Sequence, residues 1–370
     1  MGEGAEGITV SETTCIATSL VLDSAAEATA FPSAGRDSAA SEFQLVYWRC
    51  VALCLLTART HNPSTPLLLF CNRVVEDAAP GEIVDALRKA NVQFVTLPLT
   101  YRLLQGSVSR WGNVFYVLDI VRYFADCLPY DAIVLTDADC LWRKSVAVLE
   151  PALRAERCLL YSLRPEDQKN YGGDVLINGM SRRSMVAVLE GVFGKRLDIP
   201  PPHNGGEVFA ATRAYCHKVL DQLDPLWRYA CEHVSDADGI KTEEHLLNIL
   251  AWANGVRSEG ANPFIRRLWT NFEDRNVRAS DVDLAIWHVP AEKKFGFRRM
   301  WESYAASGKP WSDRGPEAVN AEAGRWMGIP VRNARKLGQD LLAKVHEKAT
   351  ERLRALARID GGVGSAARDP

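Results

Sequence analysis

The chain has 370 residues, of which 47% are hydrophobic and 24% are charged, an ordinary composition for a soluble globular protein. Its formal net charge of −2 gives no reason to expect a nucleic acid or an anionic membrane as a partner. No apolar run approaches the roughly 20 residues of a membrane-spanning helix, and the first residues lack the basic and apolar regions of a signal peptide. The nine cysteines are an odd number and include no CxxC pair, which indicates a reducing compartment. We therefore expect a cytoplasmic protein without an integral membrane segment.

Residues 14–138 alternate between apolar, strand-like runs and longer helix-like runs. Strands are predicted at 14–23, 66–72, 92–98 and 131–138, and helices at 42–61, 80–92 and 113–128. Strands separated by helices of this length form βαβ units, so we expect an α/β fold with a mixed, mainly parallel sheet flanked by helices. Ligands of such sheets gather beyond the carboxyl ends of the central strands.

The pattern is less regular after residue 142. A Gly-rich stretch at 170–180 and a Pro-rich loop at 198–206 precede a predicted strand at 207–212 and a helix from about Arg213. The stretch 335–358 is an amphipathic helix that either packs on the domain or forms a contact between two copies of the chain. Its apolar side consists of Leu337, Leu341, Leu342, Val345, Ala349, Leu353 and Leu356. We divide the chain into a disordered N-terminus (1–12), one α/β domain (13–330), a C-terminal helical extension (331–358) and a disordered tail (359–370).

Two aspartates, Asp137 and Asp139, stand at the end of the apolar run in "DAIVLTDADCLW" (131–142). The same Asp-x-Asp spacing recurs at 236–238, in a turn, and at 281–283, before a predicted strand. Only the first pair follows a buried strand in an α/β unit, where two carboxylates are costly unless they are paired or bound to a cation. Hard divalent cations prefer such oxygen ligands. The context favours a metal site over a solvated strand end.

Four stretches resemble, in order, the motifs of GT-A-fold nucleotide-sugar glycosyltransferases of family 8, the retaining group that contains glycogenin and the lipopolysaccharide galactosyltransferases. They are "YFADCLPYDAIVLTDADCLW" (123–142), "PHNGGEVFAAT" (202–212), "EEHLLN" (243–248) and "IWHVPAEKK" (286–294). The resemblance implies a Rossmann-like GT-A catalytic domain. It also implies metal-dependent transfer of a sugar, with retention, from a nucleotide diphosphate sugar, UDP-linked by default, to a hydroxyl of a soluble small-molecule or protein acceptor.

The resemblance also assigns residues to the site. Asp137, Asp139 and His288 would bind the metal, and Glu243 and Glu244 would be catalytic, beside the donor sugar. The expected donor and nucleotide contacts are Thr18, Ser19, Arg110, Asn113, Arg122, Asp137, Ala138, Asn204, Gly205, Gly206 and Lys294, and the expected acceptor contact is Asp174. Departures from the group are Ala291 in place of Gly, Glu243-Glu244 in place of Asp-Gln, and a Lys-Pro-Trp sequence that appears only at 309–311. Lys293, Lys294 and Lys309 therefore all stay candidates for the diphosphate contact.

The chemistry explains these residue types. Cleavage of the bond between the sugar and the diphosphate builds negative charge on the leaving group, which a divalent cation and a lysine stabilise. A histidine ligand favours Mn²⁺ over Mg²⁺. Glu243 and Glu244 would stabilise the oxocarbenium-like sugar, or one of them would act as a general base in an inverting enzyme. A capping role after Thr242 is the structural alternative.

Other classes of protein are also consistent with parts of the pattern. A sugar-1-phosphate nucleotidyltransferase needs a Gly-rich, Arg-containing loop after its first strand, and "TSLVLDSAAEAT" (18–29) has none. A phosphatase that forms an aspartyl phosphate has Thr or Val two residues after the second aspartate, where this chain has Leu141. A degenerate GT-A domain that binds nucleotide sugars without turnover stays open as the non-enzymatic alternative.

Overall fold

The computed structural model describes most of the chain. The described residues are 13–29, 37–103, 112–165, 172–236, 239–334, 336–338, 340–342, 344–345 and 348–349. None of the described helices is both long enough and apolar enough to cross a membrane.

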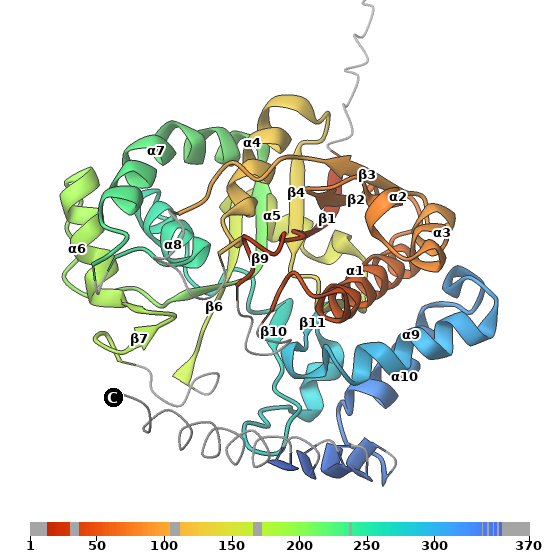
Figure 1. Ribbon diagram of the computed structural model, residues 1–370. Coiled ribbons are helices and arrows are strands. Elements are labelled where there is room, and N and C mark those ends of the chain that lie inside the picture. The colour runs from red at the N-terminus through yellow and green to blue at the C-terminus, as the bar shows by residue number, and fades with distance from the viewer. Residues whose placement is uncertain are drawn as a thin grey trace, which may run out of the picture.

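A six-stranded sheet forms the centre of the fold, with the strand order β3-β2-β1-β4-β9-β6 (Figure 1). The strands are β1 (Thr14–Leu20), β2 (Leu67–Cys71), β3 (Val92–Thr96), β4 (Ala132–Thr136), β6 (Cys158–Ser162) and β9 (Asn204–Thr212). The first four strands in this order pair in parallel, and β9 pairs antiparallel with both β4 and β6. Every residue of β2 and β4 is buried, as the continuous apolar runs of a sheet covered on both faces require.

Helices cover both faces of this sheet. One hydrophobic core joins alternate strand residues such as Ile16 to α1 (Ser41–His61), α3 (Gly81–Lys89) and α5 (Glu150–Glu156). The opposite core joins Cys15 and Ala17 to helices on the other face. Those helices are α4 (Tyr116–Cys127), α6 (Arg182–Phe193), α7 (Arg213–Glu232) and α8 (Glu243–Ala253). Because side chains alternate between the faces of a strand, one strand contributes to both cores.

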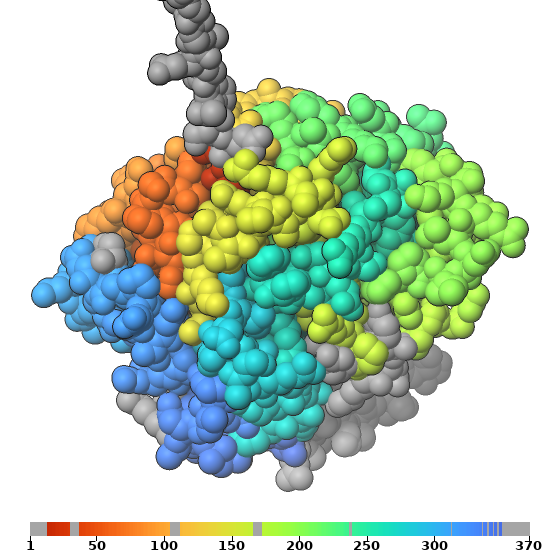
Figure 2. All heavy atoms as spheres, turned by 180° about the vertical axis from the view of Figure 1, so that it is seen from behind, coloured from red at the N-terminus to blue at the C-terminus, as the bar shows by residue number. Residues whose placement is uncertain are grey.

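A smaller three-stranded sheet lies beside the end of β4. Its order is β10 (Ile265–Arg267), β11 (Ile286–His288) and β5 (Cys140–Trp142), with β11 antiparallel to β5. The remaining elements are the hairpin β7 (Leu176–Ile177) and β8 (Met180–Ser181), the helices α2 (Val75–Ala78), α9 (Gly296–Ser307) and α10 (Pro316–Met327), and the 3₁₀ helices η1 (Val146–Val148), η3 (Ala279–Asp283), η4 (Pro290–Glu292) and η5 (Trp311–Asp313). In Figure 2 the C-terminal helices (blue) lie beside the N-terminal segments (orange), in line with the contacts of α9 and α10 with α1.

The predicted fold class, a mixed α/β fold with a mainly parallel sheet flanked by helices, is confirmed. Within residues 336–349, the described part of the expected C-terminal helix is helical. Its apolar side chains Leu337, Leu341, Leu342 and Val345 are 40–72% exposed, so the described residues do not show the expected packing of this side on the domain. The two tails and the rest of that helix lie outside the described residues, and the domain boundaries stay a prediction.

Candidate functional site

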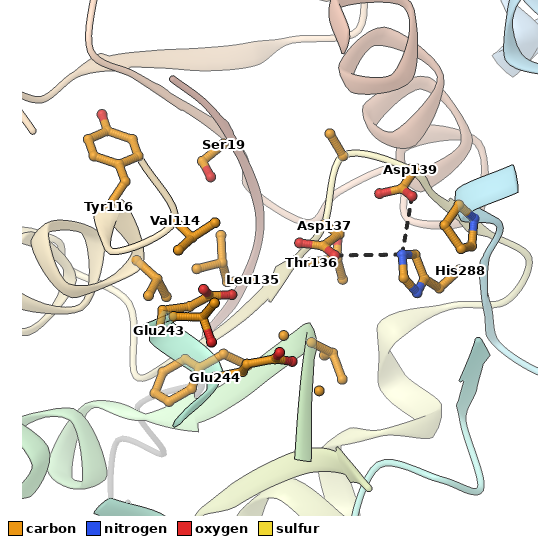
Figure 3. Close-up of a pocket in the computed structure, with 18 of the residues that line it drawn as sticks. Ser19, Val114, Tyr116, Leu135, Thr136, Asp137, Asp139, Glu243, Glu244 and His288 are labelled. Atoms are coloured by element: carbon orange, nitrogen blue, oxygen red, sulfur yellow. Dashed lines mark hydrogen bonds and ion pairs between the residues drawn. The ribbon is translucent and has the colours of Figure 1, made fainter. Parts of the chain in front are cut away.

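A pocket of about 450 Å³ opens at the carboxyl ends of β1 and β4, where the strand order predicts a ligand. Its lining contains residues from all four stretches that carry the resemblance: Asp137 and Asp139, Asn204 to Gly206, Glu243 and Glu244, and His288. Figure 3 shows Asp137, Asp139 and His288 at one end of this pocket and Glu243 and Glu244 at the other. We call these the metal-ligand end and the α8 end.

The turn between β4 and β5 positions the two aspartates. The backbone NH of Asp137 donates to Glu207 O of β9 at 3.0 Å, and the NH of Cys140 donates back to Asp137 O at 3.2 Å. This geometry separates the two carboxyl groups. The Asp137 side chain is 49% exposed in the pocket, whereas that of Asp139 is 3% exposed.

His288 reaches the same point from β11, because the register of the small sheet sets His288 opposite Cys140. Its Nε2 lies 3.2 Å from Asp139 Oδ2 and 3.6 Å from Asp137 Oδ2 (Figure 3). One ligand atom from each of the three side chains lies within 4.8 Å of the others. Two carboxylate oxygens and one imidazole nitrogen suit Mn²⁺ or Mg²⁺, so the residues fit the expected metal.

Lys293 completes this end of the pocket. Its Nζ lies 2.6 Å from Asp139 Oδ2, and its side chain is 9% exposed. The same ammonium lies 5.7 Å from the centre of the Tyr47 ring of α1. A cation held between a carboxylate and an aromatic face keeps its charge even where water is scarce. Lys293 lines the pocket, whereas the expected Lys294 and the alternative Lys309 are exposed and lie outside the lining.

A second pair of charges lies behind His288. Glu207 of β9 is fully buried, and its Oε1 lies 3.5 Å from His288 Nδ1 and accepts a hydrogen bond from Arg267 Nε of β10. A carboxylate that holds one nitrogen of an imidazole leaves the other nitrogen directed at a metal. Gly205 makes room for this pair, since a Cβ there would lie 2.1 Å from Glu207 Oε2 and 2.9 Å from Arg267 Nη2.

These contacts set the pKa values at the metal-ligand end. Burial alone would raise the pKa of Asp139, but Lys293 and His288 outweigh it and hold that pKa well below its usual range. Burial would lower the pKa of His288, but Asp139 and Glu207 raise it to about 9. Enclosure in the pocket and the negative charge of Asp139 raise the pKa of Asp137. Before a metal binds, His288 therefore carries a proton at neutral pH.

Glu243 and Glu244 begin α8, where the N-terminal end of the helix supports negative charge. The carboxylate of Glu244 accepts a hydrogen bond from Asn178 Nδ2, and its Oε2 lies 3.5 Å from Nε2 of the buried His203. Glu243 lies against β9, since a Cβ on Gly206 would approach its Oε1 to 2.6 Å. The Thr242 side chain makes no capping hydrogen bond.

The pKa values of the two glutamates are shifted in opposite directions. Burial, the neighbouring Glu244 and Asp137 raise the pKa of Glu243 well above its usual range. Burial would also raise the pKa of Glu244, but His203 outweighs it and lowers that pKa. The pKa values of the two adjacent carboxyl groups are therefore driven apart, which is a common arrangement where two acids have different roles.

The remaining predicted residues divide into two groups. Ser19, Asn113, Ala138, Asn204, Gly205 and Gly206 line the pocket. Thr18, Arg122 and Asp174 do not line it: Thr18 is buried and donates to Thr136 O at 2.8 Å, Arg122 donates to Tyr101 Oη, and Asp174 is exposed and paired with Arg183. Arg110 lies outside the described residues.

Sequence reasoning missed several residues of the pocket. These are Phe43 and Tyr47 of α1, and Arg267 and Trp269 in and just after β10. It also missed His203 and Glu207, which lie outside the lining but contact Glu244 and His288. The signal for Glu207 was present, because it is the one charged residue of the predicted strand at 207–212. A buried glutamate in a strand requires a cation nearby, but the sequence alone does not say which of the 44 basic residues supplies it.

The solved structures that are similar to the chain include three glycosyltransferases. The galactosyltransferase LgtC, in complex with donor and acceptor sugar analogs, is 14% identical over 87% of this chain and 99% of that chain, with a TM-score of 0.48. The bifunctional glycosyltransferase WbbM is 10% identical over 77% of this chain and has a TM-score of 0.48, and the match spans only 47% of WbbM. Mouse xyloside xylosyltransferase 1 is 10% identical over 75% of this chain and 97% of that chain, with a TM-score of 0.45.

Each of the three is named as a glycosyltransferase. No family model and no curated protein sequence matches the chain. Structural likeness at these identities and TM-scores does not identify a reaction, which has to be argued from the residues of the pocket.

Proposed function

We propose that the protein is a metal-dependent glycosyltransferase that moves a sugar from a nucleotide diphosphate sugar, UDP-linked by default, to a hydroxyl of a soluble acceptor. The observation that carries the proposal is the convergence of Asp137, Asp139 and His288, with Lys293, in one pocket with Glu243 and Glu244. The acceptor class is a small molecule or a protein.

Each end of the pocket has a distinct task in this reaction. Asp137, Asp139 and His288 would hold Mn²⁺, or Mg²⁺, which supplies Lewis-acid stabilisation of the leaving diphosphate when it is bound. Lys293 places a second fixed positive charge beside Asp139, in reach of the same leaving group. Asn204, Gly205 and Gly206 lie between the two ends and offer backbone close to the donor sugar.

The ionised Glu244 supports transfer with retention. Positive charge develops on the sugar as the bond to the diphosphate breaks, and a fixed carboxylate on the other side of the sugar stabilises it. Its hydrogen bond from Asn178 and its contact with His203 keep Glu244 oriented and charged. An inverting transferase, with Glu244 as the general base toward the acceptor, and a domain that binds the nucleotide sugar without turnover stay as alternatives.

Nine free thiols, seven of them buried, support a reducing compartment and hence the cytoplasm as the place of action. A contact between copies through the C-terminal helix stays a prediction, and sedimentation equilibrium of the full chain would test it.

A thermal-shift panel of nucleotide diphosphate sugars, with and without Mn²⁺, tests the donor and the metal together. We expect one donor to raise the melting temperature only when Mn²⁺ is present, and Asp139→Asn to remove that rise. Mn²⁺-dependent hydrolysis of the same donor then separates a transferase from a binding domain. Stabilisation that is indifferent to Mn²⁺ and to Asp139→Asn would contradict the proposal.

A further inference from the structure

A second cavity, of about 420 Å³, lies on the opposite side of the small sheet from the metal-ligand end. Trp287 lines it, while the next residue of β11, His288, lines the first pocket. Successive residues of a strand point to opposite faces, so β11 forms a wall shared by the two cavities. The far wall is formed by α10 and by the segment that follows it.

The described polar groups that line this second cavity are basic or neutral, and none is acidic. Its described polar lining consists of the guanidinium groups of Arg143 and Arg325 and the side chains of Asn320 and Asn333, and no Asp or Glu belongs to the lining. Around these groups lie apolar residues such as Trp287 and Ile329. The amide nitrogens of Asn320 and Asn333 already donate to Arg143 O and Arg325 O. The two guanidinium groups, in a lining without a carboxylate, are therefore what attracts an anion.

Arg143 is the fixed element of this site. Its guanidinium lies 3.7 Å from the centre of the Trp287 ring, which holds it by cation–π stacking. Its Nη1 and Nη2 donate to Asn320 O and Val282 O at the long distances of 3.4 and 3.5 Å, and its buried Nε has no hydrogen-bond partner. The protein therefore orients this side chain without fully using its donors.

The charge of Arg143 is also poorly compensated. It makes no ion pair within 4.0 Å with any described residue, and Asp283, the acid that acts on it, does so from beyond that distance. Burial lowers the pKa of Arg143 to about 10. A half-buried cation without a carboxylate is unfavourable, and an oxyanion at its open side would supply the missing counter-charge. A guanidinium fork matches two oxygens of one phosphate group.

We propose that the cavity lined by Arg143, Arg325, Asn320 and Asn333 binds a phosphate-type oxyanion, free or as a phosphomonoester, separately from the substrate pocket. Because β11 forms one wall and Arg143 follows β5 directly, an occupant would contact the backs of the two strands that present His288 and Asp139. A bound anion would therefore influence the metal-ligand end through the opposite face of the small sheet.

Binding of inorganic phosphate to the full chain, measured by isothermal titration calorimetry with and without UDP and Mg²⁺, tests this proposal. We expect saturable binding that UDP does not compete away. Arg143→Gln should weaken it at least roughly tenfold and Arg325→Gln by a smaller factor, because each removes a charge-assisted contact. Arg196→Gln removes the same charge from a side chain that is 78% exposed, and it should leave phosphate binding unchanged.

The two arginine variants locate the phosphate site whether or not UDP binds in the substrate pocket. Failure of the proposed glycosyltransferase function can therefore be distinguished from failure of the proposed phosphate site. Near-UV circular dichroism checks the fold of Arg143→Gln, and Arg325→Gln decides the matter if that variant unfolds. Tighter binding of glycerol 3-phosphate than of inorganic phosphate would assign a phosphomonoester, and equal binding would assign free phosphate. Absence of saturable binding, or binding unchanged in both variants, would overturn the proposal.

Discussion

At the metal-ligand end of the pocket three carboxylates face three basic groups. At the α8 end, among the described residues, the only ion pair of the two adjacent glutamates is that of Glu244 with His203. The carboxylates of the first end are Asp137, Asp139 and Glu207, and the basic groups are His288, Lys293 and Arg267. This end is nearly balanced before any cation binds. At the α8 end, burial and Glu244 raise the pKa of Glu243 and so favour its protonated form.

The difference indicates different tasks. A balanced set of charges can accept a divalent ion by releasing the proton of His288, without reorganising its neighbours. An unbalanced pair of acids instead places one negative charge at a defined point, which suits stabilisation of positive charge on a substrate. Four experiments test whether the two ends have these different tasks.

Asp139→Asn should have the largest effect, because it removes a metal ligand and leaves the buried Lys293 without its carboxylate. We expect a loss of kcat/KM of roughly 10³-fold, or about 4 kcal/mol, together with loss of metal binding by calorimetry. Asp236→Asn is the matched control, because Asp236 is an exposed residue of another Asp-x-Asp sequence. Equal effects of the two substitutions would show that the charge at position 139 has no special role.

Glu244→Gln should cost roughly 10²-fold in kcat/KM, because it removes the ionised carboxylate of the α8 end. Glu243→Gln should change kcat/KM by less than roughly threefold, because an amide resembles the protonated carboxyl group that the raised pKa of Glu243 favours. The two variants share the same chemistry and adjacent positions, so each controls for the other. Full activity of Glu244→Gln would show that an amide suffices there, as in the group with Asp-Gln at these positions.

The α8 end should also make the protein sensitive to acid. His245 is fully buried, its Nε2 donates to Ile177 O at 2.8 Å, and burial lowers its pKa to about 4. The unfolded chain takes up this proton near pH 6.5, whereas the folded chain resists it until about pH 4. Stability is therefore fully present above pH 6.5 and falls as the pH drops to 4, by about 3 kcal/mol.

Urea unfolding at several pH values would measure this loss. His245→Gln keeps a donor for Ile177 O but cannot titrate, so its stability should show a weaker pH dependence than that of the natural chain across the same interval. Parallel pH profiles for the two proteins would place the acid sensitivity elsewhere.

The parallel half of the sheet could be predicted from the sequence because each of its strands is a local apolar run between helices. Predicted strands at 66–72 and 131–138 correspond to β2 and β4, and the predicted helix at 42–61 corresponds to α1. The small sheet could not be predicted in this way, because β5, β10 and β11 are each three residues long and the pairing of β5 with β11 joins segments more than 100 residues apart.

The residues of the candidate site divide in the same way, into those that a local sequence pattern indicates and those that only the fold brings together. Asp137, Asp139 and His288 were found because each belongs to a motif that can be recognised along the chain. Lys293 was ranked below Lys294 because spacing along the chain does not give direction, and the short η4 helix turns Lys293, not Lys294, into the pocket. Glu207 and Arg267 were missed because the burial of each charge is explained only by the ion pair with the other.

Glu207→Gln should have the smallest effect of the four, since Glu207 acts on the metal through His288. Loss of its charge frees the Nδ1 side of that imidazole and weakens its hold on the orientation of Nε2, so metal affinity should fall roughly 10–100-fold. Calorimetric titration of Mn²⁺ measures this change without any assumption about the substrate. Glu259→Gln, which removes a carboxylate from an exposed pair with Arg164, should leave the affinity unchanged. The introduced amide would still offer an oxygen to Arg267, so the variant should fold. An unchanged Mn²⁺ affinity would then mean that the ion is held by the two aspartates without help from His288.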